Sequence, residues 1–222
     1  MNQSQSQKNL LDKSISWVQE RVTAKRFEHI RGVAQAGEYI ASKLPLNLDK
    51  DKVALACWLH DSCKELKSSE LVLEAKRLGL NPSKFEEENG HLLHGPVAAM
   101  TVKEKWDIKD KDVLEGIAEH TLGMAPMSLF SQVIYLADAL ERSRPADFVM
   151  PIWSELGLIP YFESEDNSTL DISKEDAELN IARAMLKASD ASIDHLIKVQ
   201  KPIHPRAVDV RNYFLAKVRV QP

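Results

Sequence analysis

Apolar residues recur at every third or fourth position along most of this chain, and the alternating pattern of a half-buried strand is hard to find. The segment 10–22 illustrates the spacing, with apolar residues at Leu11, Ile15, Val18 and Val22. Residues at such intervals share one face of an α-helix, so each segment can bury an apolar face against its neighbours. The sequence therefore predicts an all-α fold.

The predicted helices follow one another with short polar links or prolines between them. We expect helices at residues 10–22, 27–44, 51–61, 68–78, 96–106, 110–120, 128–142, 173–199 and 206–218. Prolines and an acidic run interrupt the pattern over about 147–170, which predicts an irregular excursion with one short helix around Trp153. Residues 1–9 are polar and are expected to form a disordered tail, which leaves 10–222 as a single helical domain.

Composition and charge narrow the classes of function. The two cysteines, Cys57 and Cys63, are too few for a disulfide framework and indicate reduced thiols in the cytoplasm. A net charge of -4 argues against non-specific binding of nucleic acid. No apolar stretch approaches the length of a transmembrane helix, and the polar start is unlike a signal peptide. We expect a cytoplasmic protein without nucleic-acid or membrane partners, and the sequence leaves a homodimer open.

A histidine and an aspartate, His60 and Asp61, end the apolar run that begins at Ala54. Burying two adjacent ionisable groups costs free energy unless another group compensates them. A metal ion compensates both, because it pairs with the carboxylate and takes the lone pair of the imidazole. The alternative is a helix-terminal pair at the rim of the core.

Further candidate ligands lie at the margins of other predicted helices. Asp138 is the only charge in the apolar run Val133–Leu140, so its side chain is expected to point inward. His29, His94 and His120 each lie beside or inside an apolar helical segment. Each residue alone has an ordinary explanation, such as a core histidine or an aspartate paired with a buried arginine. Together they favour one metal site, and imidazole with carboxylate suits Fe, Mn, Zn, Ni or Co better than Ca.

The order of these residues resembles that of the HD-domain metal-dependent phosphohydrolases, whose ligands follow the pattern H…HD…D. Here the pattern falls on His29, His60-Asp61 and Asp138. Other segments are similar to the bacterial symmetrical diadenosine tetraphosphate hydrolase branch of that family. These are Arg26-x-x-His29-x-x-Gly32-Val33, Leu59-His60-Asp61-x-x-Lys64-Glu65, Leu93-His94-Gly95-Pro96, His120-Thr121-x-Gly123 and Pro202-Ile203-His204-Pro205-Arg206. The resemblance implies an HD-domain helical bundle with additional C-terminal helices.

The resemblance also implies roles for individual residues. An iron ion is expected on His29, His60, Asp61 and Asp138, with Mn, Co, Ni and Zn as alternative metals. One metal is expected rather than two, with His94 and His120 as candidate ligands of a second site. The expected catalytic residues are Asp61, Lys64, His94 and His120. The expected nucleotide-binding residues are Arg26, Asp61, Ser62, Cys63, Lys64, His94, His120, Arg144, Pro202, Ile203, His204, Pro205, Arg206 and Ala207.

Two departures from the family pattern concern the substrate. After Asp138 the family usually reads Glu-Pro-x-Arg-Asp, whereas residues 141–145 here read Glu-Arg-Ser-Arg-Pro, and Ala207 stands where a threonine is usual. The resemblance implies symmetrical hydrolysis of diadenosine tetraphosphate to two ADP. The alternatives are an HD-type phosphohydrolase of other nucleotides or phosphate esters, and a nucleotide-binding module without turnover. In each case the expected partner is a small dinucleoside polyphosphate or a nucleotide.

Overall fold

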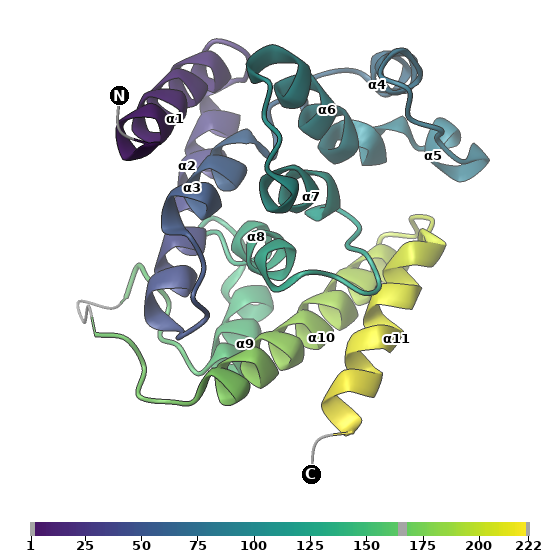
Figure 1. Cartoon of the computed structure of the whole chain (residues 1–222). Helices are drawn as coiled ribbons and strands as arrows, with labels where there is room; N and C mark the ends of the chain where they lie inside the picture. Colours follow the sequence, from purple (N-terminus) through teal and green to yellow (C-terminus); the bar gives the residue numbers. More distant parts are fainter. Residues whose placement is uncertain (1–2, 164–167, 221–222) are drawn as a thin grey trace.

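The computed structural model describes residues 3–163 and 168–220, and within these ranges it contains helices and no strand (Figure 1). The helices are α1 (Gln3–Gln19), α2 (Ala24–Lys43), α3 (Lys50–Leu59), α4 (Ser68–Arg77), α5 (Lys84–Glu88), the 3-10 helix η1 (Gly90–Leu93), α6 (His94–Trp106), α7 (Lys111–Glu119), α8 (Leu129–Ala139), α9 (Ala146–Leu156), α10 (Lys174–Lys198) and α11 (Pro205–Arg219). The predicted all-α fold is confirmed.

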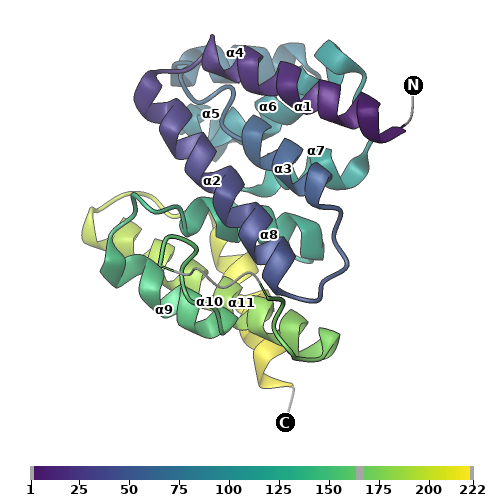
Figure 2. The ribbon, with the colours of Figure 1, turned by 90° about the vertical axis from the view of Figure 1, so that its left-hand side faces the viewer.

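Helix α8 is the centre of the arrangement. It packs against α2, α3 and α7 on one side and against α10 on another. Figures 1 and 2 show it between the N-terminal helices and the group α9–α11. Its buried residues, which include Phe130, Val133, Ile134 and Leu136, lie on several sides of the helix. A helix that is apolar around most of its circumference is stable only when neighbours surround it.

Two helix caps set the positions of the first candidate ligands. Thr23 accepts a hydrogen bond from the backbone N of Arg26, which starts α2 one turn before His29. Asp49 caps α3 in the same way, and that helix ends at Leu59. His60 and Asp61 therefore leave the C-terminal end of α3 directly, where the last carbonyls of the helix lack partners within it.

Close packing brings α2 and α3 together. A Cβ atom at Gly37 would lie 2.6 Å from Cys57 Sγ and 3.2 Å from Val53 Cγ1. Such distances are shorter than van der Waals contact, so only glycine lets the two helices approach this closely. One hydrophobic cluster continues from there through the described helices, from Val18 in α1 to Phe214 in α11.

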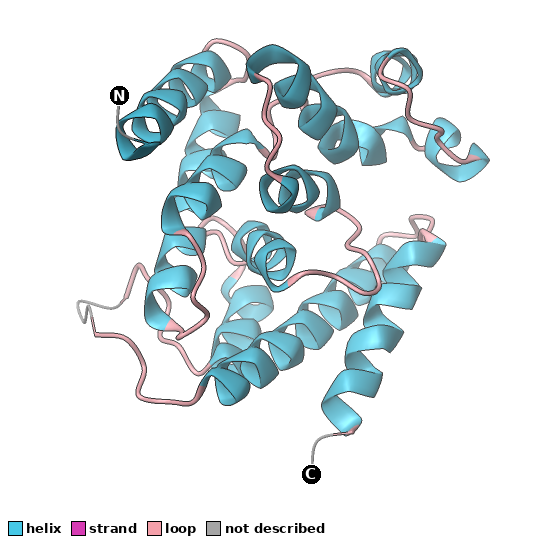
Figure 3. Cartoon of the chain, in the orientation of Figure 1, coloured by secondary structure: helices cyan, strands magenta, loops and turns pink. Residues whose placement is uncertain are grey.

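Two segments predicted to be irregular are helical in part (Figure 3). Helix α1 begins at Gln3, within the segment 1–9 that the sequence predicts to be a tail, and residues 1–2 lie outside the described range. Its glutamines are good helix formers, and the helix is anchored further along by the buried Val18. The short helix predicted around Trp153 is present as α9, so the irregular stretch within 147–170 is confined to the part after Leu156, of which 164–167 lie outside the described range.

Two prolines interrupt the apolar pattern of α9, which makes the extent of this helix hard to predict from the sequence. Pro145 precedes it and Pro151 lies inside it. Proline removes a backbone donor from a helix interior, yet buried side chains can compensate for this loss. Ile152 and Trp153 are such residues, and α9 packs along α10. Among the described residues, no helix combines the length and apolarity needed to cross a lipid bilayer.

Candidate metal centre

The six candidate ligands from five helical segments converge at one place. His29 comes from α2, His60 and Asp61 from the end of α3, His94 from the start of α6, His120 from the end of α7 and Asp138 from α8. Their ligand atoms form three overlapping groups, and within each group all atoms lie within 4.8 Å of one another. The groups are His29-His60-Asp61, His60-His120-Asp138 and Asp61-His94-His120.

Three of the histidines are oriented by the same kind of local hydrogen bond. His60, His94 and His120 are the C-cap residues of α3, η1 and α7. In each, Nδ1 lies within hydrogen-bonding distance of the carbonyl three residues earlier: Cys57 O at 2.6 Å, His91 O at 2.6 Å and Ile117 O at 2.8 Å. A carbonyl only accepts, so Nδ1 carries the proton and Nε2 presents its lone pair to the centre. This is the orientation of metal-binding histidines.

Asp61 lies between two pairs of histidines. Its Oδ2 is 3.7 Å from Nε2 of both His29 and His60, while its Oδ1 is 3.2 Å from His94 Nε2 and 3.5 Å from His120 Nε2. Burial acts to raise the pKa of Asp61, but the histidines and a nearby lysine outweigh it and hold that pKa well below its usual value. Asp61 is therefore an ionised carboxylate, buried among imidazoles.

The donor set fits a metal ion. Among the described residues, His29 Nε2, His60 Nε2 and Asp61 Oδ1 are buried and have no hydrogen-bond partner. An unsatisfied buried polar atom costs about 1–3 kcal/mol. Burial lowers the pKa of His60 to about 3 and that of His94 to about 4, so both imidazoles are neutral near pH 7. Neutral imidazoles with an ionised carboxylate are the ligands that a divalent transition metal requires.

His29 lies where negative charge accumulates. Its Nε2 is 3.1 Å from Asp138 Oδ1, and its Nδ1 is 3.3 Å from Glu141 Oε2. Burial opposes protonation, but the two neighbouring carboxylates, Asp138 and Glu141, outweigh it and raise the pKa of His29 to about 9. The surrounding carboxylates thus favour a positive charge at this point, which either a proton or a metal ion can supply.

A family model described as "HD domain" matches residues 26–143, more than half of the chain, and this range contains all six candidate ligands. The chain belongs to the HD-domain family. The prediction of an HD-domain hydrolase is thereby confirmed. Helices α9–α11 begin at Ala146, after the matched range, and are the predicted additional C-terminal helices of this HD protein.

Known proteins of similar sequence and structure cover nearly the whole chain. A "Bis(5'-nucleosyl)-tetraphosphatase, symmetrical" of Halalkalibacterium halodurans is 27% identical over 204 residues, 91% of this chain and 96% of that protein. The protein of the same name from Bacillus subtilis is 24% identical, over 92% of this chain and 97% of its own length. A crystal structure described as a "predicted HD superfamily hydrolase involved in NAD metabolism" from Clostridium acetobutylicum has a TM-score of 0.77 and 25% identity, over 93% of this chain and 97% of that one.

Glu141 contacts the candidate metal centre of this HD domain, although the sequence did not indicate it as a site residue. Besides its contact with His29, it accepts a hydrogen bond of 2.9 Å from the backbone N of Ser143. A Cβ atom at Gly32 would lie 2.7 Å from Glu141 Cγ, so glycine one turn after His29 makes room for this carboxylate. The indication of this contact in the sequence was a glycine at position 32, one helical turn after His29.

Cationic and hydroxyl groups surround the centre of the HD domain. Lys64 Nζ lies 3.0 Å from His94 Nε2, and burial lowers the pKa of Lys64. Arg26 Nη1 donates to Asp61 Oδ2 at 2.8 Å, and Arg144 Nη2 donates to Asp138 Oδ1 at 2.8 Å. Thr121, which the sequence did not single out as a site residue, has its Oγ1 3.0 Å from His94 Nε2 and 3.1 Å from His120 Nε2.

Two of the predicted nucleotide-binding side chains lie in the core. Ser62 and Cys63 are both buried. Cys63 Sγ is 3.9 Å from Thr101 Oγ1 of α6, so this thiol packs against a helix instead of facing a nucleotide. The geometry therefore does not favour the predicted nucleotide contact of the Cys63 side chain: the turn after Asp61 directs Cys63 into the core, and Lys64 is the next residue that reaches the centre.

A cavity of about 710 Å³ lies beside the metal centre of the HD domain. Its lining includes Thr121 and Arg144 near the centre and Tyr135, Phe148, Ala207 and Val210 further out. It therefore extends between the matched HD range and the additional C-terminal helices. Its walls are mainly apolar side chains with charged groups at intervals, as is usual in small-molecule sites.

The predicted C-terminal turn, residues 202–207, reaches this cavity with its last residue. Ala207 lines the cavity, whereas Pro202 is exposed at the surface. His204 caps α11: its Nδ1 accepts a hydrogen bond of 3.0 Å from the backbone N of Arg206, and Pro205 occupies the first turn. Ile203 is half-buried within the turn. The structure thus places the turn at the rim of the cavity.

Proposed function

We propose that this chain hydrolyses diadenosine tetraphosphate symmetrically to two ADP at a centre that holds iron. The observation that carries the proposal is the buried cluster around Asp61, which is surrounded by the cations Arg26, Lys64 and Arg144 and opens beside a cavity of about 710 Å³. An anionic polyphosphate needs such cations, and a nucleoside needs an adjacent apolar cavity. The names of the Halalkalibacterium halodurans and Bacillus subtilis relatives support the same substrate.

The proposed ligands of the iron are His29, His60, Asp61 and Asp138. When bound, such a metal lowers the pKa of a water molecule and polarises a phosphoryl oxygen. Mn, Co, Ni and Zn are alternatives, since imidazole and carboxylate accept all of them. The Asp61-His94-His120 group is the candidate for a second ion, but the Lys64 ammonium already brings positive charge to it. We therefore propose one metal per chain.

The chain's own residues act on the substrate through charge and position. Water attacks one of the two central phosphorus atoms, the bond from that phosphorus to the central bridging oxygen breaks, and two ADP result. The leaving ADP phosphate is a weak base, so it needs its charge met more than it needs a proton. Lys64 Nζ, 3.0 Å from His94 Nε2, can meet this charge, and Thr121 Oγ1 lies within hydrogen-bonding distance of Nε2 of both His94 and His120. Arg26 and Arg144 neutralise the remaining phosphate oxygens.

Arg144 belongs to the segment after Asp138 that departs from the family pattern. Its guanidinium still reaches the Asp138 carboxylate and lines the cavity. This observation supports a phosphate contact by Arg144, which the tetraphosphate and other phosphate esters would both use. A phosphohydrolase of other nucleotides and a binding module without turnover remain the competing proposals, and product analysis separates all three.

The decisive experiment uses the protein purified with its native metal. The metal is identified and quantified, and diadenosine tetraphosphate is supplied with chromatographic analysis of the products. ADP as the sole product is expected, with one metal per chain. Products of ATP and AMP would contradict symmetrical cleavage, and turnover of other nucleotides alone would favour the broader phosphohydrolase. Bound metal without turnover of any nucleotide would favour the binding module.

A single variant tests the assignment of the site. His60→Ala removes an imidazole that is fully buried and points its Nε2 into the centre. Bound metal and activity should disappear together. Activity that survives this change would show that the metal, or the reaction, is located elsewhere.

A further inference from the structure

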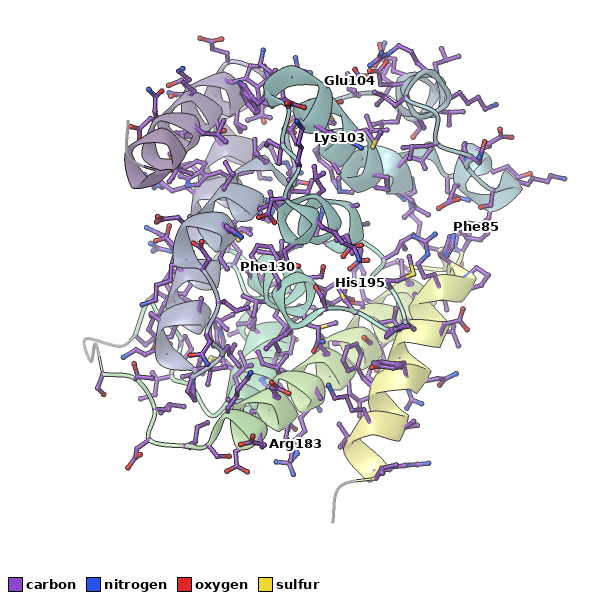
Figure 4. All side chains as sticks on the ribbon, in the orientation of Figure 1. Phe85, Lys103, Glu104, Phe130, Arg183 and His195 are labelled. Atoms are coloured by element: carbon purple, nitrogen blue, oxygen red, sulfur yellow. The ribbon has the colours of Figure 1, made fainter. Side chains whose placement is uncertain are left out.

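Helix α5 and the turn before α11 meet through their side chains, although they are far apart in the sequence. The rings of Phe85 and His204 have centroids 5.0 Å apart and stand at 83° to each other. Glu86 Oε1 lies 3.8 Å from His204 Nε2 and 3.6 Å from Arg206 Nη2. Figure 4 shows Phe85 between α5 and the turn that leads into α11. We call these four residues the α5 clasp.

The two carboxylate oxygens of Glu86 contact different groups. Oε2 accepts hydrogen bonds of 2.8 Å from both the backbone N and the Oγ of Ser83, which closes the capping box of α5. Oε1 is the oxygen that faces His204 and Arg206. The carboxylate is buried even though it is charged, which is rare without a partner of opposite charge.

The tautomer of His204 follows from its cap. Because Nδ1 accepts a hydrogen bond from the backbone N of Arg206, the ring proton is on Nε2. That N–H is buried and has no hydrogen-bond partner among the described residues. Distances of 3.6 and 3.8 Å to Glu86 Oε1 are ionic contacts, too long for hydrogen bonds. Glu86 thus lies close to both donors without forming a hydrogen bond to either of them.

The α5 clasp joins the two walls of the cavity beside the metal centre. Leu92 of η1, which follows α5 closely, lines one wall. Ala207 and Val210 of α11, which follow the turn, line the other. The clasp therefore connects the segments that lead into these two walls, which belong to separate parts of the fold.

We infer that Phe85 and Glu86 are positioning residues, which hold the turn before α11 so that the partly exposed guanidinium of Arg206 meets an anionic oxygen of a bound nucleotide. The inference rests on the proposed function for the identity of that nucleotide. A role limited to capping α5 would require only Ser83 and Oε2. The two roles can be separated, since they use different oxygens of one side chain.

Glu86→Gln is the discriminating variant, because glutamine can still accept from Ser83 while its charge is lost. We expect KM for diadenosine tetraphosphate to rise about five- to tenfold and kcat to stay within about twofold, as for loss of one partly buried charge pair at a binding site. Metal content should be unchanged. The matched control is Glu88→Gln on the same helix, whose side chain is 63% exposed and faces only Lys84 in a long ion pair. It should leave KM unchanged.

A double-variant cycle tests whether Glu86 acts through Arg206. If it does, Glu86→Gln combined with Arg206→Gln should raise KM no further than Arg206→Gln alone, because both changes disrupt one contact. Additive effects would overturn the inference, and so would an unchanged KM in Glu86→Gln. A fall in kcat accompanied by loss of metal would also overturn it, since that result would place the effect of Glu86 at the metal centre.

Hydrogen exchange tests the clasp without any substrate. The backbone N–H of Ala207 donates to His204 O at 2.9 Å, and that of Arg206 donates to His204 Nδ1. Both amides should exchange several-fold faster in Glu86→Gln than in Glu88→Gln or the unchanged chain, because the turn loses its anchor. Equal rates in the two variants would overturn the clasp. Should the unchanged protein fail to cleave diadenosine tetraphosphate, the proposed function alone would fail.

Discussion

Arg26 donates a hydrogen bond of 2.8 Å from Nη1 to Oδ2 of Asp61, the carboxylate at the centre of the candidate metal site. The Nε of the same guanidinium is buried and has no partner among the described residues. One face of Arg26 thus holds Asp61, and another donor remains for a phosphate oxygen. Arginine is suited to both tasks at once because its donors diverge from one rigid plane.

Arg26→Gln should weaken substrate binding more than metal binding. Loss of a hydrogen bond from a charged donor is expected to raise KM about tenfold. Bound metal should remain, because removing a cation near the centre reduces electrostatic repulsion toward the metal. Steady-state kinetics and metal analysis of the same preparation measure both quantities. Arg31→Gln, a change of the exposed arginine that pairs with Glu28 on the same helix, is the control; equal KM values in the two variants would contradict the assignment.

Asp61→Asn should abolish both metal binding and activity. Asparagine keeps the shape of the side chain but removes the charge that faces both histidine pairs. We expect metal affinity and turnover to fall by at least about a hundredfold. Metal titration of the chelator-treated protein and an activity assay provide the measurements. Asp107→Asn is the matched control: that residue is 81% exposed and has a positive φ of 52°, which asparagine tolerates. Comparable metal binding in the two variants would refute the role of Asp61.

Glu141→Gln should weaken metal binding without removing it. The Glu141 carboxylate accepts from Nδ1 of His29, which orients Nε2 toward Asp138, and loss of such a supporting group typically costs 10- to 100-fold in affinity. Gly32→Ala should have a similar effect, since the new Cβ would lie 2.7 Å from Glu141 Cγ. Calorimetric titration with the metal alone is the measurement. Glu28→Gln, beside His29 but exposed, should bind metal as the unchanged chain does.

The long helices could be predicted from the sequence because each has an apolar face with helical spacing. Helix α5 has only five residues, too few to show such a period, and it was missed. Its capping box, from Ser83 to Glu86, was the one local signal present. The N-terminal residues of α1 could not be predicted as helix for another reason. They are all polar, and the residue that packs this helix into the core, Val18, lies near its other end.

The candidate ligands could be named from the sequence, but their supporting residues could not. The resemblance to HD-domain proteins pointed to His29, Asp61 and Asp138, whereas spacing alone indicated only a metal site of unknown extent. Glu141 contacts His29 across 112 positions of sequence, and no local pattern encodes a contact of that kind. Glu86 could not be predicted for the same reason, and Thr121 was present only as part of a motif, because the contacts of both depend on how separate helices pack.

Cys57 and Cys63 should resist modification while the protein is folded. Both thiols are free and buried, and burial raises the pKa of each above its ordinary value. The thiolate is the reactive form, so a disulfide reagent at pH 8 should react slowly with the native protein. In denaturant both thiols should react at once, which calibrates the assay. Rapid labelling of either thiol in the native state would show that the helix ends around the metal centre open readily.

Gly37→Ala should destabilise the fold, even though alanine is the better helix former. Alanine gains about 1 kcal/mol of helix propensity over glycine, but its Cβ would lie 2.6 Å from Cys57 Sγ in a closely packed interface. Overpacking of this kind costs about 1–3 kcal/mol, so a net loss is expected in urea unfolding. Cys57→Ala should restore stability in the double variant, because it removes the atom that clashes and the new methyl group fills the space left. A Gly37→Ala protein as stable as the unchanged chain would show that α2 and α3 can separate at this point without cost.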